Sequence, residues 1–81
     1  MNTTGQQMNT IGQRIREARK TRGLTIQKLA KKAEIHPNTL LCYEHGYSLP
    51  GIYALIQLAD ILEVPLDWLA GREAPTNDRY K

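Results

Sequence analysis

Cysteine and histidine are scarce in this chain of 81 residues, which contains one Cys and two His. A single cysteine, Cys42, excludes an intrachain disulfide, and together with His36 and His45 it does not provide the ligands of a zinc site. We therefore expect no bound metal. A lone free cysteine is typical of a reducing compartment, which predicts a cytoplasmic protein.

Long apolar runs are also missing. The longest uncharged stretch with apolar character, residues 46–59, is interrupted by Pro50 and Gly51 and is too short to cross a bilayer. The first residues, MNTTGQQMNT, contain neither a basic segment nor an apolar one. We therefore expect no secretory signal and no membrane partner.

The residue patterns that catalysis and cofactor binding require are absent as well. The sequence has no Gly-rich phosphate loop and no pair of acidic metal ligands. Cys42 and His45 lie three residues apart, but nothing supplies a third orienting group or an oxyanion hole. The sequence predicts a protein that is not an enzyme and needs no cofactor.

Charge is unevenly distributed along the chain, which has a formal net charge of +3 from 11 Lys or Arg and 8 Asp or Glu. Residues 14–32 hold eight of the basic residues and one acidic residue, Glu17. Residues 33–81 hold the other three basic residues and seven acidic residues. A basic segment on an otherwise acidic domain is typical of a protein that contacts phosphate groups.

Helical periodicity dominates the middle of the sequence, because apolar residues recur three to four positions apart and no segment alternates with a period of two. Five short helices are expected, which predicts an all-α, compact five-helix bundle. The first helix is expected to begin with a capping box at Thr10 and Gln13 and to end at Gly23, and the second to begin after an N-cap at Thr25. The third is expected to begin at His36-Pro37 and to end at Gly46. The fourth is expected over residues 52–62, and the fifth from Pro65 to a stop at Gly71.

The domain is expected to comprise residues 10–71, with flexible tails at residues 1–9 and 72–81. In the helix over residues 52–62, one stripe of apolar residues is expected to face the core: Leu55, Leu58, Ala59 and Leu62.

Residues 25–46 have the spacing of two helices joined by a tight turn. Ala30 is small where the two helices would cross, and Ile35 places an apolar side chain in the turn. Leu40 and Tyr43 lie three residues apart and can anchor the second helix to the core. These features predict a helix-turn-helix, whose second helix projects from the surface.

A resemblance to a known family rests on three segments, IGQRIREARKTRGLT, LAKKAEIHPNTLLCYEHGYSLP and LIQLADILEVPLDWLAG. They resemble the Cro/repressor-type helix-turn-helix regulators of bacteria and phages, over residues 11–71, about three quarters of the chain. The resemblance implies the lambda-repressor-like fold. It also implies a double-stranded DNA partner, with the helix that starts at Pro37 lying in the major groove.

In that arrangement the residues expected to read bases are Pro37, Asn38, Thr39, Leu41 and Cys42. The amide of Asn38 can pair with adenine, and Leu41 and Thr39 offer apolar contact to a thymine methyl group. Cys42 stands where relatives usually have a polar residue, so the preference is expected to rest on methyl contacts and DNA shape. The alternative interpretation is that Leu41 packs against a neighbour and Cys42 is a small buried residue.

Phosphate contacts are expected at the start of the second helix and at the end of the third, from Thr25, Gln27, Lys28, His45 and Tyr47. Relatives commonly have Gln at the position of Ile26, which cannot donate to a phosphate, and Lys28 can compensate with its charge. A further set of basic residues is open between phosphate contacts and a solvated face: Arg14, Arg16, Lys20, Lys31 and Lys32.

Other residues are expected to have structural roles. Arg19 and Glu44 match a pair that forms a salt bridge between the first and third helices in similar proteins. Glu34 and Glu63 occupy turn positions where relatives often have glycine, at a cost on the order of 1 kcal/mol for a left-handed residue. A dimer contact is expected in the fifth helix, at Leu66, Trp68 and Leu69.

We therefore expect a transcriptional regulator, and specifically a repressor that acts as a homodimer on a palindromic operator with half-sites about 34 Å apart. No small-molecule effector is expected. Phage regulators, mobile-element repressors, restriction–modification controllers and antitoxins share this bundle, so the setting is open. The alternative is a protein-interaction module or antitoxin-like partner-binding protein, which would dock its partner through Pro37, Leu41 and Cys42.

Overall fold

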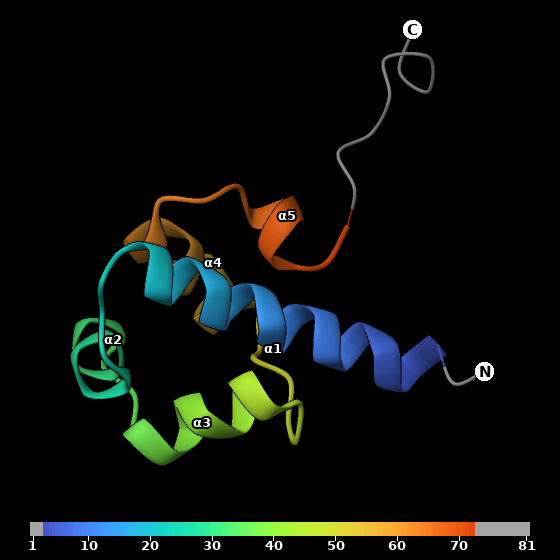
Figure 1. Ribbon diagram of the computed structural model, residues 1–81, viewed down its shortest axis with the longest axis horizontal. Coiled ribbons are helices and arrows are strands. Elements are labelled where there is room, and N and C mark those ends of the chain that lie inside the picture. The colour runs from blue at the N-terminus through green and yellow to red at the C-terminus, as the bar shows by residue number, and fades with distance from the viewer. Residues whose placement is uncertain (1–2, 73–81) are drawn as a thin grey trace, which may run out of the picture.

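The computed structural model describes the backbone of residues 3–72 and the side chains of residues 10–72. This part of the chain folds into five helices, α1 (Thr3–Thr21), α2 (Ile26–Ala33), α3 (Pro37–His45), α4 (Ile52–Leu62) and α5 (Leu66–Leu69). No strand lies between residues 3 and 72, so the prediction of an all-α five-helix bundle is confirmed (Figure 1). Among these helices, none combines the length and the hydropathy that a bilayer span needs.

The first helix begins earlier than expected. It starts at Thr3, so Thr10 lies inside the helix and the prediction of a capping box at Thr10 and Gln13 is wrong. The expected division into a tail of residues 1–9 and a domain of residues 10–71 stays a prediction. Residues 3–9 contain no proline, and extending an existing helix adds a hydrogen bond without a new nucleation step. The expected C-terminal tail, residues 72–81, lies outside the described residues except for Arg72.

The later helix starts follow local capping chemistry. Thr25 caps α2, because its Oγ1 accepts a hydrogen bond from the backbone N–H of Lys28 at 3.1 Å. Pro37 occupies the first position of α3, where its missing N–H removes no helical hydrogen bond. His36 adds a cap that the sequence analysis did not include, since its Nδ1 accepts the N–H of Asn38 at 3.0 Å.

Two helices end at a glutamate in the left-handed conformation. Glu34 follows α2 with a φ of 58°, and Glu63 follows α4 with a φ of 57°. Their backbone N–H groups donate to carbonyls of the preceding turn and so close the two helices. These are the two positions at which the resemblance implies a left-handed turn without glycine, so that expectation is confirmed.

Every helix contributes to a single core. In Figure 1, α1 runs through the middle of the molecule, with α3 on one side of it, α5 on the other and α4 behind. Small side chains at Ala30 and Ala33 let α2 pack closely against α3 and α4. The large side chains with no more than 1% of their surface exposed are Ile15, Leu29, Leu40, Leu58, Leu62 and Leu69.

Helices α1 and α3 approach each other closely at Gly12. A Cβ atom at this position would lie 2.5 Å from the backbone oxygens of Tyr43 and Glu44, far inside van der Waals contact. Glycine therefore lets α1 cross the last turn of α3 backbone to backbone. This role of Gly12 was not predicted from the sequence, although a glycine inside a helical pattern is a sign of close packing.

We expect Gly12→Ala to lower the free energy of unfolding by about 2 kcal/mol, because the added methyl group would force α1 away from α3. Gly51→Ala is the matched control, since nothing lies within 4 Å of its added Cβ and its φ of −65° suits alanine. Because Gly51 is the N-cap of α4, where alanine is less favourable than glycine, we expect a smaller loss of about 0.5–1 kcal/mol. Urea unfolding followed by circular dichroism measures both variants, and equal stabilities would contradict the packing role of Gly12.

Candidate nucleic-acid interface

Helix α3 turns one side to the core and the other to solvent. Leu40 is fully buried and Tyr43 packs against the core, whereas Asn38, Leu41 and His45 are exposed. The exposed residues are spaced three and four positions apart, which places them on one side of the helix. We call this row the outer side of α3. It is a projecting row of side chains of the kind that a recognition helix presents.

The residues expected to read bases lie on and around this outer side. Asn38 is exposed and Leu41 is 37% exposed, while Pro37, Thr39 and Cys42 are half-buried. Neither Leu41 nor Cys42 belongs to the buried core, which argues against the alternative interpretation that they are interior residues. The contacts that these five side chains make with DNA stay predictions.

The residues expected to contact phosphate occupy two exposed segments. Thr25, Gln27 and Lys28 are exposed where α2 begins, and His45 and Tyr47 are exposed where α3 ends. The rings of His45 and Tyr47 stack, with their centroids 5.7 Å apart and their planes at 23°. All five are therefore accessible, and their phosphate contacts stay predictions.

A shallow basin of about 160 Å³ lies beside the outer side of α3. It brings Arg16 of α1 and Ile26 of α2 next to Leu41 and His45 of α3. Arg16 is one of the five basic residues for which the sequence left open a phosphate contact or a solvated face. It is exposed and lies next to the candidate interface. The sequence alone did not single it out, because its place depends on how α1 crosses α3.

The predicted salt bridge between α1 and α3 is confirmed. Arg19 Nε donates to Glu44 Oε2 at 2.7 Å, and Arg19 Nη2 donates to Oε1 at 3.0 Å. The pair is nearly buried, with 11% of the arginine side chain and 4% of the glutamate side chain exposed. Arg19 Nη1 also donates to the carbonyl of Leu24 at 3.0 Å. This network ties α3 to α1 and to the turn that leads into α2.

A second arginine of the basic segment has a structural role. Arg14 Nη1 donates to the carbonyl of Trp68 at 2.6 Å, and its guanidinium lies 5.1 Å from the centroid of the indole ring. Leu69 has no exposed surface, so the prediction that it contacts a second copy is wrong. Leu66 and Trp68 are half-buried against the same core. Helix α5 therefore packs against its own domain, because its apolar side contacts Arg14 and the core.

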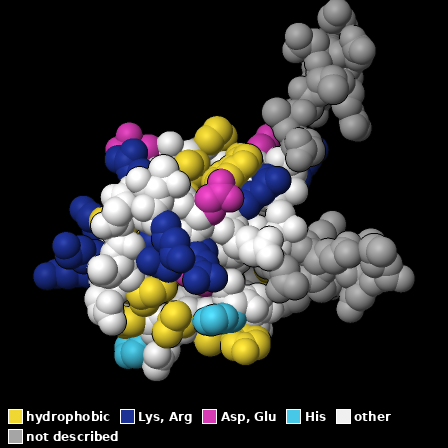
Figure 2. Space-filling model, in the orientation of Figure 1, with side chains coloured by type: hydrophobic (Ala, Val, Ile, Leu, Met, Phe, Trp, Pro, Cys, Tyr) yellow, Lys and Arg dark blue, Asp and Glu magenta, His cyan; other side chains and the backbone are white. Residues whose placement is uncertain are grey.

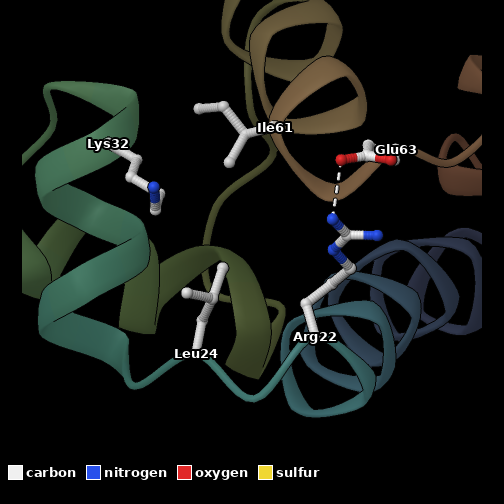
Figure 3. A pocket seen from close by; sticks show the side chains of 5 residues that line it. All are labelled: Arg22, Leu24, Lys32, Ile61 and Glu63. Carbon is white, nitrogen blue, oxygen red and sulfur yellow. Dashed lines mark hydrogen bonds and ion pairs between the residues drawn. The ribbon is translucent and has the colours of Figure 1, made fainter.

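A cleft of about 540 Å³ opens elsewhere on the surface, between the end of α1, α2 and α4. Figure 3 shows Leu24 and Ile61 lining it, with Lys32 on one side and Arg22 joined to Glu63 on the other. Arg22 Nη2 lies 2.6 Å from Glu63 Oε2, and both side chains are well exposed. Lys32 is therefore a cation in this cleft, away from the basin that borders the outer side of α3.

The basic side chains gather on the face that Figure 2 shows. Lys and Arg lie over α1 and along the edge formed by α2, and the few acidic side chains in view lie toward α4 and α5. Hydrophobic and histidine side chains border α3 on the same face. The outer side of α3 is thus flanked by positive charge, an arrangement that attracts a negatively charged partner such as nucleic acid.

A model of the helix-turn-helix domain matches residues 12–74 of the chain. The chain belongs to this helix-turn-helix family. The resemblance to Cro/repressor-type regulators is thereby confirmed.

This helix-turn-helix chain is similar to two transcriptional regulators of Bacillus subtilis (strain 168). It is 34% identical to the HTH-type transcriptional regulator ImmR over 64 residues, and 38% identical to the HTH-type transcriptional regulator AnsR over 60 residues. These matches cover 79% and 74% of the chain, but 50% and 52% of the two relatives. The chain spans about half the length of the curated relatives that it matches.

Two solved helix-turn-helix structures have the same fold. The restriction-modification controller protein C.AhdI from Aeromonas hydrophila has a TM-score of 0.73 and 26% identity, covering 76% of this chain and 94% of that one. SinR, the master regulator for biofilm formation, was solved in complex with DNA and has a TM-score of 0.69 and 33% identity. That match covers 73% of this chain and 95% of the SinR chain. The lambda-repressor-like fold is confirmed.

We expect Glu44→Gln to lower the free energy of unfolding by about 3 kcal/mol, because it leaves the guanidinium of Arg19 nearly buried without its counter-ion. Glu63→Gln makes the same chemical change in the exposed pair with Arg22. Solvent already screens that pair, so the expected loss is below about 1 kcal/mol. Guanidinium chloride unfolding monitored by tryptophan fluorescence compares the two variants. Similar losses in both would show that burial of the Arg19–Glu44 pair has no special effect.

Proposed function

We propose that this chain is a transcriptional regulator, not an enzyme, that binds double-stranded DNA sequence-specifically with α3 in the major groove. The observation that carries the proposal is the exposed outer side of α3, which is flanked by basic side chains. The nearly buried Arg19–Glu44 pair fixes α3 to α1. The DNA-bound state of SinR and the regulatory function of ImmR and AnsR support it.

Base reading is assigned to the first two turns of α3. Asn38 is exposed next to the helix start, where its amide can donate to N7 and accept from N6 of adenine. Leu41 lies one turn further along and suits a thymine methyl group. Cys42 and Thr39 border this contact, and Pro37 lies where the backbone enters the groove. Because this set includes no Arg or Lys, the preference is expected to favour A·T pairs and DNA shape.

Phosphate contacts are assigned to both ends of this surface. At the start of α2, Thr25, Gln27 and Lys28 approach one strand together with the free N–H groups of the helix end. His45 and Tyr47 donate to a phosphate beyond the end of α3. Ile26 offers no such contact, so the charge of Lys28 anchors this end of the interface.

A single α3 helix reads only a few base pairs, so specificity in a genome is expected from two copies. We propose a homodimer on a palindromic operator, with half-sites about 34 Å apart. Occupation of such a site would exclude polymerase, which is the action of a repressor in the cytoplasm.

Selection of bound sequences from a random pool of DNA duplexes tests the proposal. We expect a two-fold symmetric consensus rich in A·T pairs beneath α3, with half-sites about one DNA turn apart. Affinity for the selected duplex should fall steeply with salt, as in any complex dominated by phosphate contacts. A pool that yields no consensus and a protein that binds no duplex at low salt would refute the proposal and point to the partner-binding alternative.

Two variants separate base reading from phosphate contact. Asn38→Ala should lose about 1–3 kcal/mol of discrimination at one base pair of the consensus, whereas Lys28→Ala should weaken binding to all sequences and reduce the salt slope by about 1. Lys32→Ala removes the same charge from the cleft shown in Figure 3 and is the matched control, expected to leave the salt slope nearly unchanged. Fluorescence anisotropy over a salt series measures all three, and equal slopes for Lys28→Ala and Lys32→Ala would contradict the assignment of Lys28.

A further inference from the structure

Helix α4 has a second apolar side that no part of residues 10–72 covers. Leu55, Leu58, Ala59 and Leu62 face the core, yet large hydrophobic side chains are also exposed at the start of this helix and just before it. Their exposed fractions are 51% for Leu49, 60% for Ile52, 84% for Tyr53 and 38% for Ile56. We call these four residues the α4 face.

We infer that the α4 face is the two-fold contact through which a second copy of this chain is bound. The residues form one surface, because Ile52, Tyr53 and Ile56 share a side of the helix and Leu49 lies just before it in the connecting loop. Tyr47 is also exposed but is left out, since it stacks on His45 at the candidate DNA interface.

The charge pattern favours self-association over other partners. Residues 46–59 contain no Asp, Glu, Lys or Arg, and no Lys or Arg occurs between Ala33 and Gly71. In a two-fold contact the residues close to the axis lie near their own counterparts, so any charge there would face an identical charge. The four residues of the α4 face are uncharged and avoid this repulsion. The exposed Asp60 lies one turn beyond Ile56 on the same side of α4, so it would belong to the polar rim. The lack of cations in this segment also argues against DNA phosphates or an anionic membrane as its occupant.

The size and composition of the α4 face suit a small homodimer. From their exposed fractions, these four side chains offer on the order of 400 Å² of largely apolar area, as large as functional patches on monomeric proteins. With a polar rim of similar area, the contact would remove roughly 800 Å² from each copy, as in standard interfaces. Tyr53 provides the large amphipathic ring that is enriched at the centre of such contacts.

The α4 face is connected to the candidate DNA interface by a short loop. Residues 46–51 lead from the end of α3 to the start of α4, and Figure 1 shows this loop running directly between them. A two-fold axis at the α4 face therefore fixes the two α3 helices relative to each other through a short, capped connection. Helix α5, where the sequence predicted the contact, is engaged by Arg14 and the core.

Sedimentation equilibrium of the full chain, over a range of micromolar concentrations, tests the inference. We expect a monomer–dimer equilibrium whose Kd rises at least about thirtyfold in Tyr53→Glu, as for a central contact residue that is changed twice per dimer. The site is 84% exposed, so the fold should be unchanged by circular dichroism. Thr21→Glu adds the same charge at an exposed position on α1 and should keep the wild-type Kd.

A mixing experiment locates the axis. Tyr53→Glu and Tyr53→Lys should each be monomeric alone, and an equimolar mixture should recover dimers because opposite charges then meet across the axis. Monomeric wild-type protein throughout the concentration range would overturn the inference. A wild-type Kd in Tyr53→Glu, or no recovery of dimers in the mixture, would overturn it equally.

The inference rests on the proposed function only in that the dimer is expected to serve DNA binding. DNA-binding measurements distinguish a failure of the proposed function from a failure of the inferred dimer contact. Tyr53→Glu should bind a duplex that carries one selected half-site as wild-type protein does, and should lose the cooperative gain on the full palindrome. If no duplex is bound while Tyr53→Glu still dissociates the dimer, the proposed function fails and the α4 face stands. If two copies of the wild-type protein bind the palindrome independently, the α4 face is not the dimer contact, whereas the proposed DNA binding stands.

Discussion

The ion pair between Arg19 and Glu44 is the interaction on which the rest of this structure depends. It joins the last turn of α1 to the last turn of α3, and the same guanidinium reaches the carbonyl of Leu24 at the turn before α2. Taking two charges out of water is costly, and the pair recovers that cost only in this geometry. Any arrangement of α3 that separates Arg19 from Glu44 is therefore strongly disfavoured. The orientation of α3 is fixed as a result, with its outer side toward solvent.

The two ends of α3 are positioned by different means. At its end, Gly12 lets the backbone of α1 touch the carbonyls of the same turn that carries Glu44, so close packing and charge act together. At its start, Pro37 and the ring nitrogen of His36 order the first turn by local contacts. The start, which carries the exposed base-reading candidate Asn38, is thus ordered by contacts within α3 and its cap.

The basic segment divides into two groups that its sequence does not distinguish. Three arginines are engaged by other parts of the described fold. Arg14 contacts the carbonyl and the indole ring of Trp68, Arg19 pairs with the nearly buried carboxylate of Glu44, and Arg22 pairs with the exposed carboxylate of Glu63. Arg16 instead borders the outer side of α3, and Lys28 is exposed at the start of α2. A charge count alone therefore overstates the number of basic side chains that are not engaged within the fold.

Local chemistry determined much of this protein from the sequence alone. The starts at Thr25 and Pro37 and the buried stripe of α4 followed from residues within a turn or two of each other, and family resemblance supplied the Arg19–Glu44 pair. Tertiary structure alone decided the rest: the approach at Gly12, the burial of Leu69 and the apolar side of α4 that stays uncovered. Each of these depends on how helices distant in sequence cross, and helical periodicity does not report which of two apolar sides another helix will cover.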